Sequence, residues 1–207
     1  MPDLTPLWIS IKVGFISTII VSILGIFICR TLYKRKGHAT QFLESLILLP
    51  IVLPPTVLGF ILIIVFSPRT FVGQFFQNVL HLPVVFTMTG AVIASVIVSF
   101  PLMYQHTIQG FRSINPKMLN TARTMGASER KIFYRLILPL SKRSIIAGIM
   151  MSFARAIGEF GATLMVAGYI PNKTNTLPLE IYFLVEQGKE NQAWLWDVSY
   201  THLRAHE

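Results

Sequence analysis

The chain of 207 residues is poor in charge and contains a single cysteine. Charged residues make up 13% of it, about half the roughly 25% typical of soluble domains. Apolar residues reach 53%, and the mean hydropathy is +0.59. So few charges cannot cover the surface of a soluble domain of this size, so the composition predicts an integral membrane protein. Cys29 alone offers neither a disulfide framework nor a thiolate metal cluster.

Catalytic motifs are also missing from the sequence. A P-loop that binds ATP needs Gly-x4-Gly-Lys-Ser/Thr, but Phe183 stands at the first glycine position before Gly188 and Lys189. No Ser-His-Asp arrangement or zinc-ligand spacing is evident either. The sequence therefore predicts a protein that is not an enzyme, with no catalytic residue, no metal site and no cofactor bound by this chain.

Basic residues outnumber acidic residues by 18 to 9, which gives a net charge of +9. Such an excess can indicate nucleic-acid binding. Here, however, most of the basic residues lie in two segments, 30–36 and 112–143, and both segments lie between long apolar runs. This is the positive-inside pattern of membrane proteins, and we expect no nucleic-acid partner. The pattern places residues 30–41 and 105–144 in the cytoplasm and the N-terminus outside.

Four apolar runs are long enough to cross a bilayer, which takes about 20 residues per helix. They cover residues 8–29, 42–66, 84–104 and 145–169. We therefore expect an all-α membrane protein, a polytopic bundle of transmembrane helices. In the fourth run Gly148, Ser152 and Ala156 recur every four residues, and the third run has a similar stripe. Small residues at this spacing let two membrane helices approach closely.

Two of these runs contain residues that are unusual inside a membrane. Pro50, Pro54 and Pro55 interrupt the second run, and proline removes a helix hydrogen bond. Because such a break must face protein or water, it favours a pore-lining or gating segment over a harmless kink. Arg155 and Glu159 lie four residues apart in the fourth run, where they can pair on one helix face. The two residues form either a functional site or a structural ion pair, and the sequence does not decide between these roles.

The loop between the third and fourth runs predicts two short amphipathic helices. Asn115-Pro116 is a typical helix start, Gly126 ends the first helix, and Ser128 begins a second that ends at Pro139. One apolar face of the first helix comprises Met118, Leu119, Ala122 and Met125. The pair either rests on anionic lipid headgroups or docks a cytoplasmic partner.

This loop resembles the "EAA" loop of ABC importer permeases. That pattern is Glu-Ala-Ala, three residues, Gly, nine residues, Ile, one residue and Leu-Pro. The spacing agrees throughout, although two opening residues differ and a leucine replaces the isoleucine. The matching positions are Asn120, Thr121, Ala122, Gly126, Leu136, Leu138 and Pro139. The resemblance implies that these residues form the helices that fit into a groove of the ATPase subunit.

Residues 53–59, 99–104, 153–163 and 167–179 resemble the permeases of molybdate importers and their sulfate relatives. The resemblance implies a membrane domain of the type I ABC importer permease kind over residues 1–196, in the cell membrane of a bacterium or archaeon. It implies a homodimer that forms the pore, a pair of cytoplasmic ATP-binding subunits that hydrolyse ATP, and an extracytoplasmic oxyanion-binding protein. The candidates for pore or gate residues are Pro54, Pro55, Arg155, Glu159 and Gly161.

Molybdate is the substrate that this resemblance favours, and sulfate, thiosulfate or tungstate are the alternatives within the family. A channel or secondary transporter is the rival from another class. Secondary transporters often carry internal repeats and chains of ionisable residues in the membrane, whereas this sequence has no clear repeat and one such pair.

The end of the chain departs from the family pattern. Residues 197–207 resemble a non-native tail, and they stand where the family has its final membrane span. We expect that span to be missing from this sequence.

Overall fold

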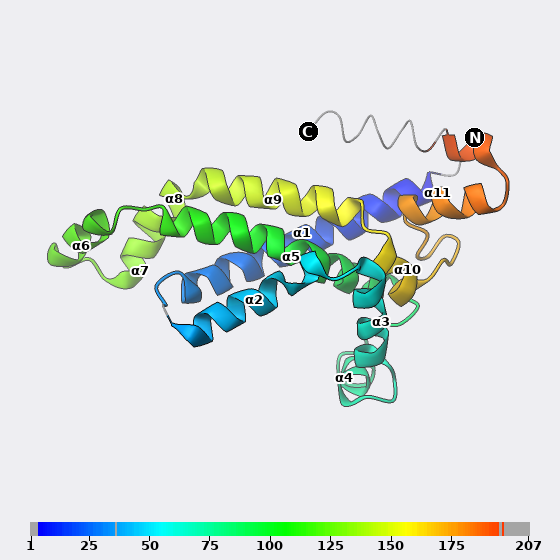
Figure 1. Cartoon of the computed structure of the whole chain (residues 1–207), viewed down its shortest axis with the longest axis horizontal. Coiled ribbons are helices and arrows are strands. Elements are labelled where there is room, and N and C mark those ends of the chain that lie inside the picture. Colours follow the sequence, from blue (N-terminus) through cyan, green and yellow to red (C-terminus); the bar gives the residue numbers. More distant parts are fainter. Residues whose placement is uncertain (1–3, 36, 195, 197–207) are drawn as a thin grey trace.

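The computed structural model describes residues 4–35, 37–194 and 196 of the chain. Every regular element in this part is a helix (Figure 1), which confirms the all-α fold expected from the sequence. Two helices, α1 (Thr5–Leu32) and α5 (Met88–Arg112), are long and apolar enough to cross a membrane. The number rises to four if each of two bent helix pairs counts as one span. The expected non-native tail, 197–207, lies outside the described residues.

The core of the bundle is formed by α1, α5 and α9 (Lys142–Ile157), each of which packs against the other two. A Cβ atom on Gly25 of α1 would lie 2.7 Å from Met103 Cγ, and one on Gly148 of α9 would lie 3.0 Å from Met103 Sδ. Ser152 Oγ of α9 donates to a backbone carbonyl of α5 at 3.3 Å. Small residues thus let α1 and α9 approach α5 closely. The close contact that the sequence predicts between the third and fourth runs is confirmed.

The second apolar run forms two helices, α2 (His38–Val52) and α3 (Pro55–Phe66), whose axes differ by 115°. Leu53 and Pro54 are extended, with ψ of 138° and 135°. Neither proline of the Pro54-Pro55 pair has an N–H to continue the helix, so the predicted break occurs here, whereas Pro50 remains inside α2. Figure 1 shows α3 leaving the long bundle sideways toward α4 (Phe71–Gln74), which continues into the π-helix η1 (Phe75–Val79).

The fourth apolar run is also divided, and the expectation of one continuous helix over 145–169 is wrong. Helix α9 ends at Ile157, and the next helix, α10 (Gly161–Ala167), begins four residues later. Gly158 (ψ 10°) and Phe160 (φ −124°) leave helical geometry. Glycine is a weak helix former, and the break lets α10 turn onto α3. A loop then leads to α11 (Leu177–Glu186), which is tied to α1 by a 2.7 Å hydrogen bond from Leu177 N to Ser10 Oγ.

The loop over residues 115–140, here called the docking segment, forms the predicted helix pair. Its first helix is α6 (Pro116–Thr124), and its second comprises α7 (Glu129–Ile132), the π-helix η2 (Phe133–Ile137) and α8 (Leu138–Leu140). The second helix meets α9 at an angle of 67°. Figure 1 shows α6 and α7 at one end of the long bundle, with α10 and α11 toward the other.

Candidate functional site

Two helix breaks meet at the side of the bundle, where the start of α3 packs against α10. A Cβ atom on Gly161 would lie 2.9 Å from Pro55 Cβ, and one on Gly59 would lie 2.6 Å from Met165 Cβ. Both distances are too short for a real Cβ atom, so glycine at these two positions lets α3 and α10 pack closely against each other. The proline break in the second run and the break in the fourth run therefore form one structural unit.

Glu159 joins this unit to the end of α9. Its Oε2 lies 2.6 Å from Arg155 Nη1, so the predicted ion pair is present. Its Oε1 accepts a 2.8 Å hydrogen bond from the backbone N–H of Ala162, in the first turn of α10. Glu159 is 2% exposed, whereas the side chain of Arg155 is 33% exposed. The glutamate lies beyond the end of α9, so the pair bridges a helix break and does not lie on one helix face.

A cavity of about 310 Å³, here called the central cavity, opens beside this pair. Four of the five pore or gate candidates line it, namely Pro55, Arg155, Glu159 and Gly161, whereas Pro54 is not among its lining residues. Thr56, Gly158 and Phe160 complete the lining. Because Glu159 balances the charge of Arg155, the cavity presents a neutral pair and not a free cation. An oxyanion would find only weak attraction there.

The docking segment owes its shape to local capping. The side chain of Asn115 accepts from Lys117 N at 2.9 Å and so caps the start of α6. Gly126 has φ of +79°, a left-handed conformation that a Cβ disfavours. Its N–H donates to the carbonyl of Arg123, and Ala127 N donates to the carbonyl of Ala122, at 2.9 and 3.0 Å. The glycine thus ends α6 and directs the chain into α7.

The apolar face that the sequence predicts for the first helix of the docking segment is divided between the core and the surface. Leu119 is buried in the main core cluster, and Ala122 packs against this cluster, which also includes Met103, Phe111 and Phe133. Met118 and Met125, predicted for the same apolar face, are 46% and 81% exposed. The predicted apolar face is therefore divided, with two of its four residues against the bundle and two on the exposed surface of α6. No signal in the local sequence separates the two methionines from the buried positions.

The seven positions of the "EAA"-like pattern divide between surface and core. Asn120, Thr121 and Gly126 are exposed on α6 and at its end, and Pro139 is exposed near the end of the second helix. The remaining three, Ala122, Leu136 and Leu138, pack against the main core cluster. The segment therefore presents Asn120 and Thr121 on the surface of α6, which it shares with the exposed Met118, while its second helix is anchored in the bundle.

Glu129 ties the docking segment to the end of α1. Its Oε1 accepts from Arg123 Nε at 2.7 Å, and its Oε2 accepts from Lys34 Nζ. These hydrogen bonds from Arg123 and Lys34 lower the pKa of Glu129. The guanidinium of Arg30 lies 4.6 Å from the ring centre of Phe133, which adds a cation–π contact between α1 and η2. Exposed ion pairs add little to the free energy of unfolding. These contacts therefore set the orientation of the docking segment and contribute little to its stability.

Metal-binding groups do not gather in the described part of the chain. No three histidine, cysteine or acidic side chains there lie close enough together to hold an ion. The one cysteine, Cys29, is buried in α1.

The chain matches known membrane transport proteins over most of its length. Residues 21–185 match the family described as "Binding-protein-dependent transport system inner membrane component". The chain is 44% identical over 194 residues to the putative molybdenum transport system permease protein YvgM of Bacillus subtilis, covering 94% of this chain and 86% of that protein. It is 33% identical over 185 residues to the molybdenum transport system permease protein ModB of Escherichia coli, covering 89% and 81%. The ModB protein of Azotobacter vinelandii is 32% identical over 194 residues, covering 93% and 86%.

Proposed function

We propose that this chain, which belongs to the family of inner membrane components of binding-protein-dependent transport systems, is the permease subunit of a molybdate importer. The observation that carries the substrate is the 44% identity to a relative named as a molybdenum transport permease. The two ModB proteins described above are also named as molybdenum transport permeases. The chain is thus an integral protein of the cell membrane, and the permeant anion is an oxyanion.

Energy for transport would come from a partner. We infer that two copies of this chain form the pore, that a pair of cytoplasmic subunits hydrolyses ATP, and that an extracytoplasmic protein delivers the anion. The chain itself would have no ATPase activity and would bind no cofactor. The exposed surface of α6, with the "EAA"-like spacing, is the surface that we assign to the ATPase contact.

The central cavity is the part of the chain that we assign to the gate. Two helix breaks meet there, and broken helices are typical of transport paths. The neutral Arg155–Glu159 pair suits a path that must release its anion, because a free buried cation would retain it. The residues that would act at the gate are Pro54, Pro55, Arg155, Glu159 and Gly161.

An uptake experiment tests the substrate. Cells that lack their own molybdate permease would express this chain with its ATPase and binding protein, and their molybdenum content would be measured by mass spectrometry. We expect accumulation at low external molybdate, and no accumulation when the ATPase carries an inactivated P-loop. Restored sulfate uptake without molybdenum accumulation would contradict the proposal, and accumulation of molybdate that persists with the inactive ATPase would favour a channel or secondary transporter.

Orientation is tested by single cysteines. The native Cys29 is buried, so it gives little background labelling. Arg130→Cys lies in the docking segment and Arg69→Cys lies beyond α3, and both positions are exposed. With an outside N-terminus, an impermeant thiol reagent added to intact cells should label position 69 and should reach position 130 only after permeabilisation. The reverse pattern would overturn the orientation.

A further inference from the structure

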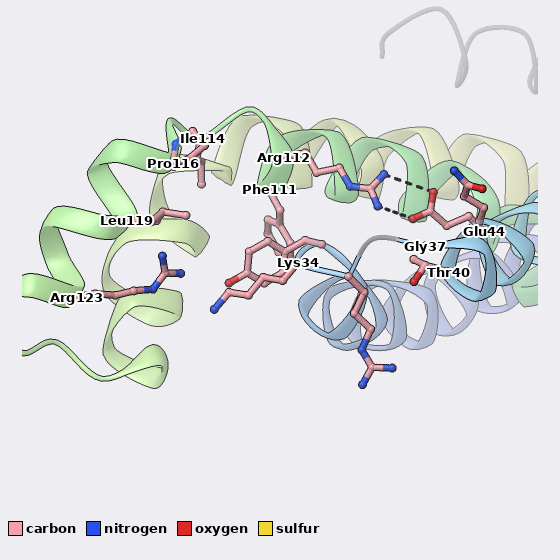
Figure 2. Close-up of a pocket in the computed structure, with 13 residues that line it drawn as sticks. Lys34, Gly37, Thr40, Glu44, Phe111, Arg112, Ile114, Pro116, Leu119 and Arg123 are labelled. Atoms are coloured by element: carbon pink, nitrogen blue, oxygen red, sulfur yellow. Dashed lines mark hydrogen bonds and ion pairs between the residues drawn. The ribbon is translucent and has the colours of Figure 1, made fainter.

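A second and larger cavity lies where the docking segment meets the bundle (Figure 2). Its volume is about 670 Å³, within the range of roughly 300–1,000 Å³ that small-molecule sites occupy. Its walls come from the end of α1, the turn into α2, the end of α5 and the first helix of the docking segment. It shares no lining residue with the central cavity. We call it the basic cavity because four cationic side chains line it.

One of the four cations is neutralised inside the cavity. Arg112, the last residue of α5, faces Glu44 of α2, with Nη2 2.5 Å from Oε1 and Nη1 3.4 Å from Oε2. Figure 2 shows this pair as two parallel contacts on one side of the cavity. Such a bidentate pair leaves little net charge to attract a ligand. Arg112 and Glu44 therefore form a wall of the cavity and not its binding group.

The other three cations carry excess positive charge. Lys34 and Arg123 approach the cavity from opposite sides in Figure 2, and they share the single carboxylate of Glu129. Arg35 is exposed at the cavity wall, and none of the ion pairs found among the described residues includes it. Three cations thus face one carboxylate, and the cavity attracts an anion.

Apolar side chains form the rest of the wall. Phe111 and Leu119 are buried there, and Tyr33 and Ile114 are half-buried. A ligand that fills this space therefore needs an anionic group for the basic side and carbon atoms for the apolar side. A free inorganic anion supplies only the first, whereas a phospholipid supplies a phosphodiester and a glycerol carrying acyl chains.

The position of the cavity agrees with the level of lipid headgroups. Arg112 ends the apolar helix α5, and Lys34 follows the end of the apolar helix α1. Tyr33 lies beside them, and tyrosine is enriched at the interface between membrane and water. Basic pockets between membrane helices on the cytoplasmic side bind acidic headgroups.

We propose that the basic cavity binds the headgroup of an anionic phospholipid, such as phosphatidylglycerol. The bound lipid touches α6 and the turn between α1 and α2 at the same time, so it holds the docking segment against the bundle. Lipid binding at this cavity is a property separate from molybdate transport, and it can be measured without any substrate.

The test uses the assembled complex of permease and ATPase in detergent, titrated with phosphatidylglycerol and followed by native mass spectrometry. Arg35→Gln removes the cation that has no ion pair, so it is expected to leave the fold intact. The variant should lower the affinity for the most tightly bound lipid about fivefold, which is the usual contribution of one basic side chain near anionic lipid headgroups. Arg35→Lys should restore most of the affinity. Arg143→Gln is the matched control, because Arg143 is an exposed basic residue at the start of α9 that does not line the cavity.

Each other outcome overturns the proposal. Equal losses in Arg35→Gln and Arg143→Gln would mean that lipids respond only to the overall charge. No loss in either variant would mean that Arg35 takes no part. Displacement of the lipid by inorganic phosphate alone would identify the ligand as a free anion. Lipid binding by the permease alone, but not by the complex, would show that the ATPase occupies the cavity.

Discussion

Removing either partner of the Arg155–Glu159 pair should have unequal effects, because the two side chains differ in exposure and in their other contacts. Arg155→Ala leaves the carboxylate of Glu159, which is 2% exposed, without its counter-charge. Breaking a buried pair in this way typically costs about 3–5 kcal/mol. Glu159→Ala leaves Arg155 instead, and its side chain is one-third exposed and can turn toward the central cavity.

The cost of Glu159→Ala then comes mainly from the lost contacts of the carboxylate. Its hydrogen bond to Ala162 N resembles a helix cap, which is worth about 1 kcal/mol, and hydrogen bonds to charged groups are worth about 1.5–3 kcal/mol. We expect a loss of about 1–3 kcal/mol for this variant. Glu159→Gln keeps an oxygen that can accept from Ala162 N and loses only the charge, so its loss should be about 1 kcal/mol.

The assay is thermal unfolding of the purified complex in detergent, with molybdate uptake measured in parallel. The Tm values should fall in the order wild type, Glu159→Gln, Glu159→Ala and Arg155→Ala. The exchange variant, with Arg155→Glu and Glu159→Arg, should not recover the wild-type Tm, because an arginine at 159 cannot accept from Ala162 N. Full recovery by the exchange would refute the bridging role of Glu159. A larger loss in Glu159→Ala than in Arg155→Ala would refute the argument that an unpaired buried carboxylate is the more costly outcome.

Three further variants test other parts of the structure. Gly161→Val would push a Cβ to 2.9 Å from Pro55 Cβ, so the Tm of the complex should fall with a cost of about 1–3 kcal/mol, and an unchanged Tm would contradict the close α3–α10 contact. Gly126→Asp forces a side chain into φ of +79°, so co-purification of the ATPase and uptake should fall while the amount of permease in the membrane stays normal. Hydrogen bonds from Arg123 and Lys34 lower the pKa of Glu129. The ionised Glu129 should therefore stabilise the complex fully above pH 4.5, the ordinary pKa of a glutamate, and this stabilisation should be lost as the pH falls through the lowered pKa. Glu129→Gln should abolish this small acid dependence of the Tm, and an identical pH profile in the variant would contradict it.

Features that depend on neighbouring residues in the sequence could be predicted. The two long helices follow from long apolar runs, and the break at Leu53 follows from two consecutive prolines that cannot donate a hydrogen bond. The docking segment follows from Asn115 at its start and Gly126 at its turn. In each case the cause lies within a few residues of the effect.

Features that depend on distant contacts could not be predicted. Residues 158–160 look helical in the sequence, because they lie in an apolar run rich in small residues, yet the helix ends there. The reason is that α10 packs on α3, about a hundred residues earlier in the chain. Likewise, four-residue spacing correctly predicts that Arg155 and Glu159 pair, but it cannot reveal that Glu159 also caps α10.

We propose that the break after α9 lets the docking segment and the central cavity act together. Helix α9 begins just after the docking segment, where Ser141 Oγ donates to the carbonyl of Gly110 at 3.0 Å. It ends at Ile157, two residues before Glu159, and its 16 residues span about 24 Å. A rigid helix of this length transmits a displacement at one end to the other. Because the chain leaves helical geometry at Gly158, such a displacement would move Arg155 relative to α10 and α3, and the Arg155–Glu159 pair would have to stretch or rotate.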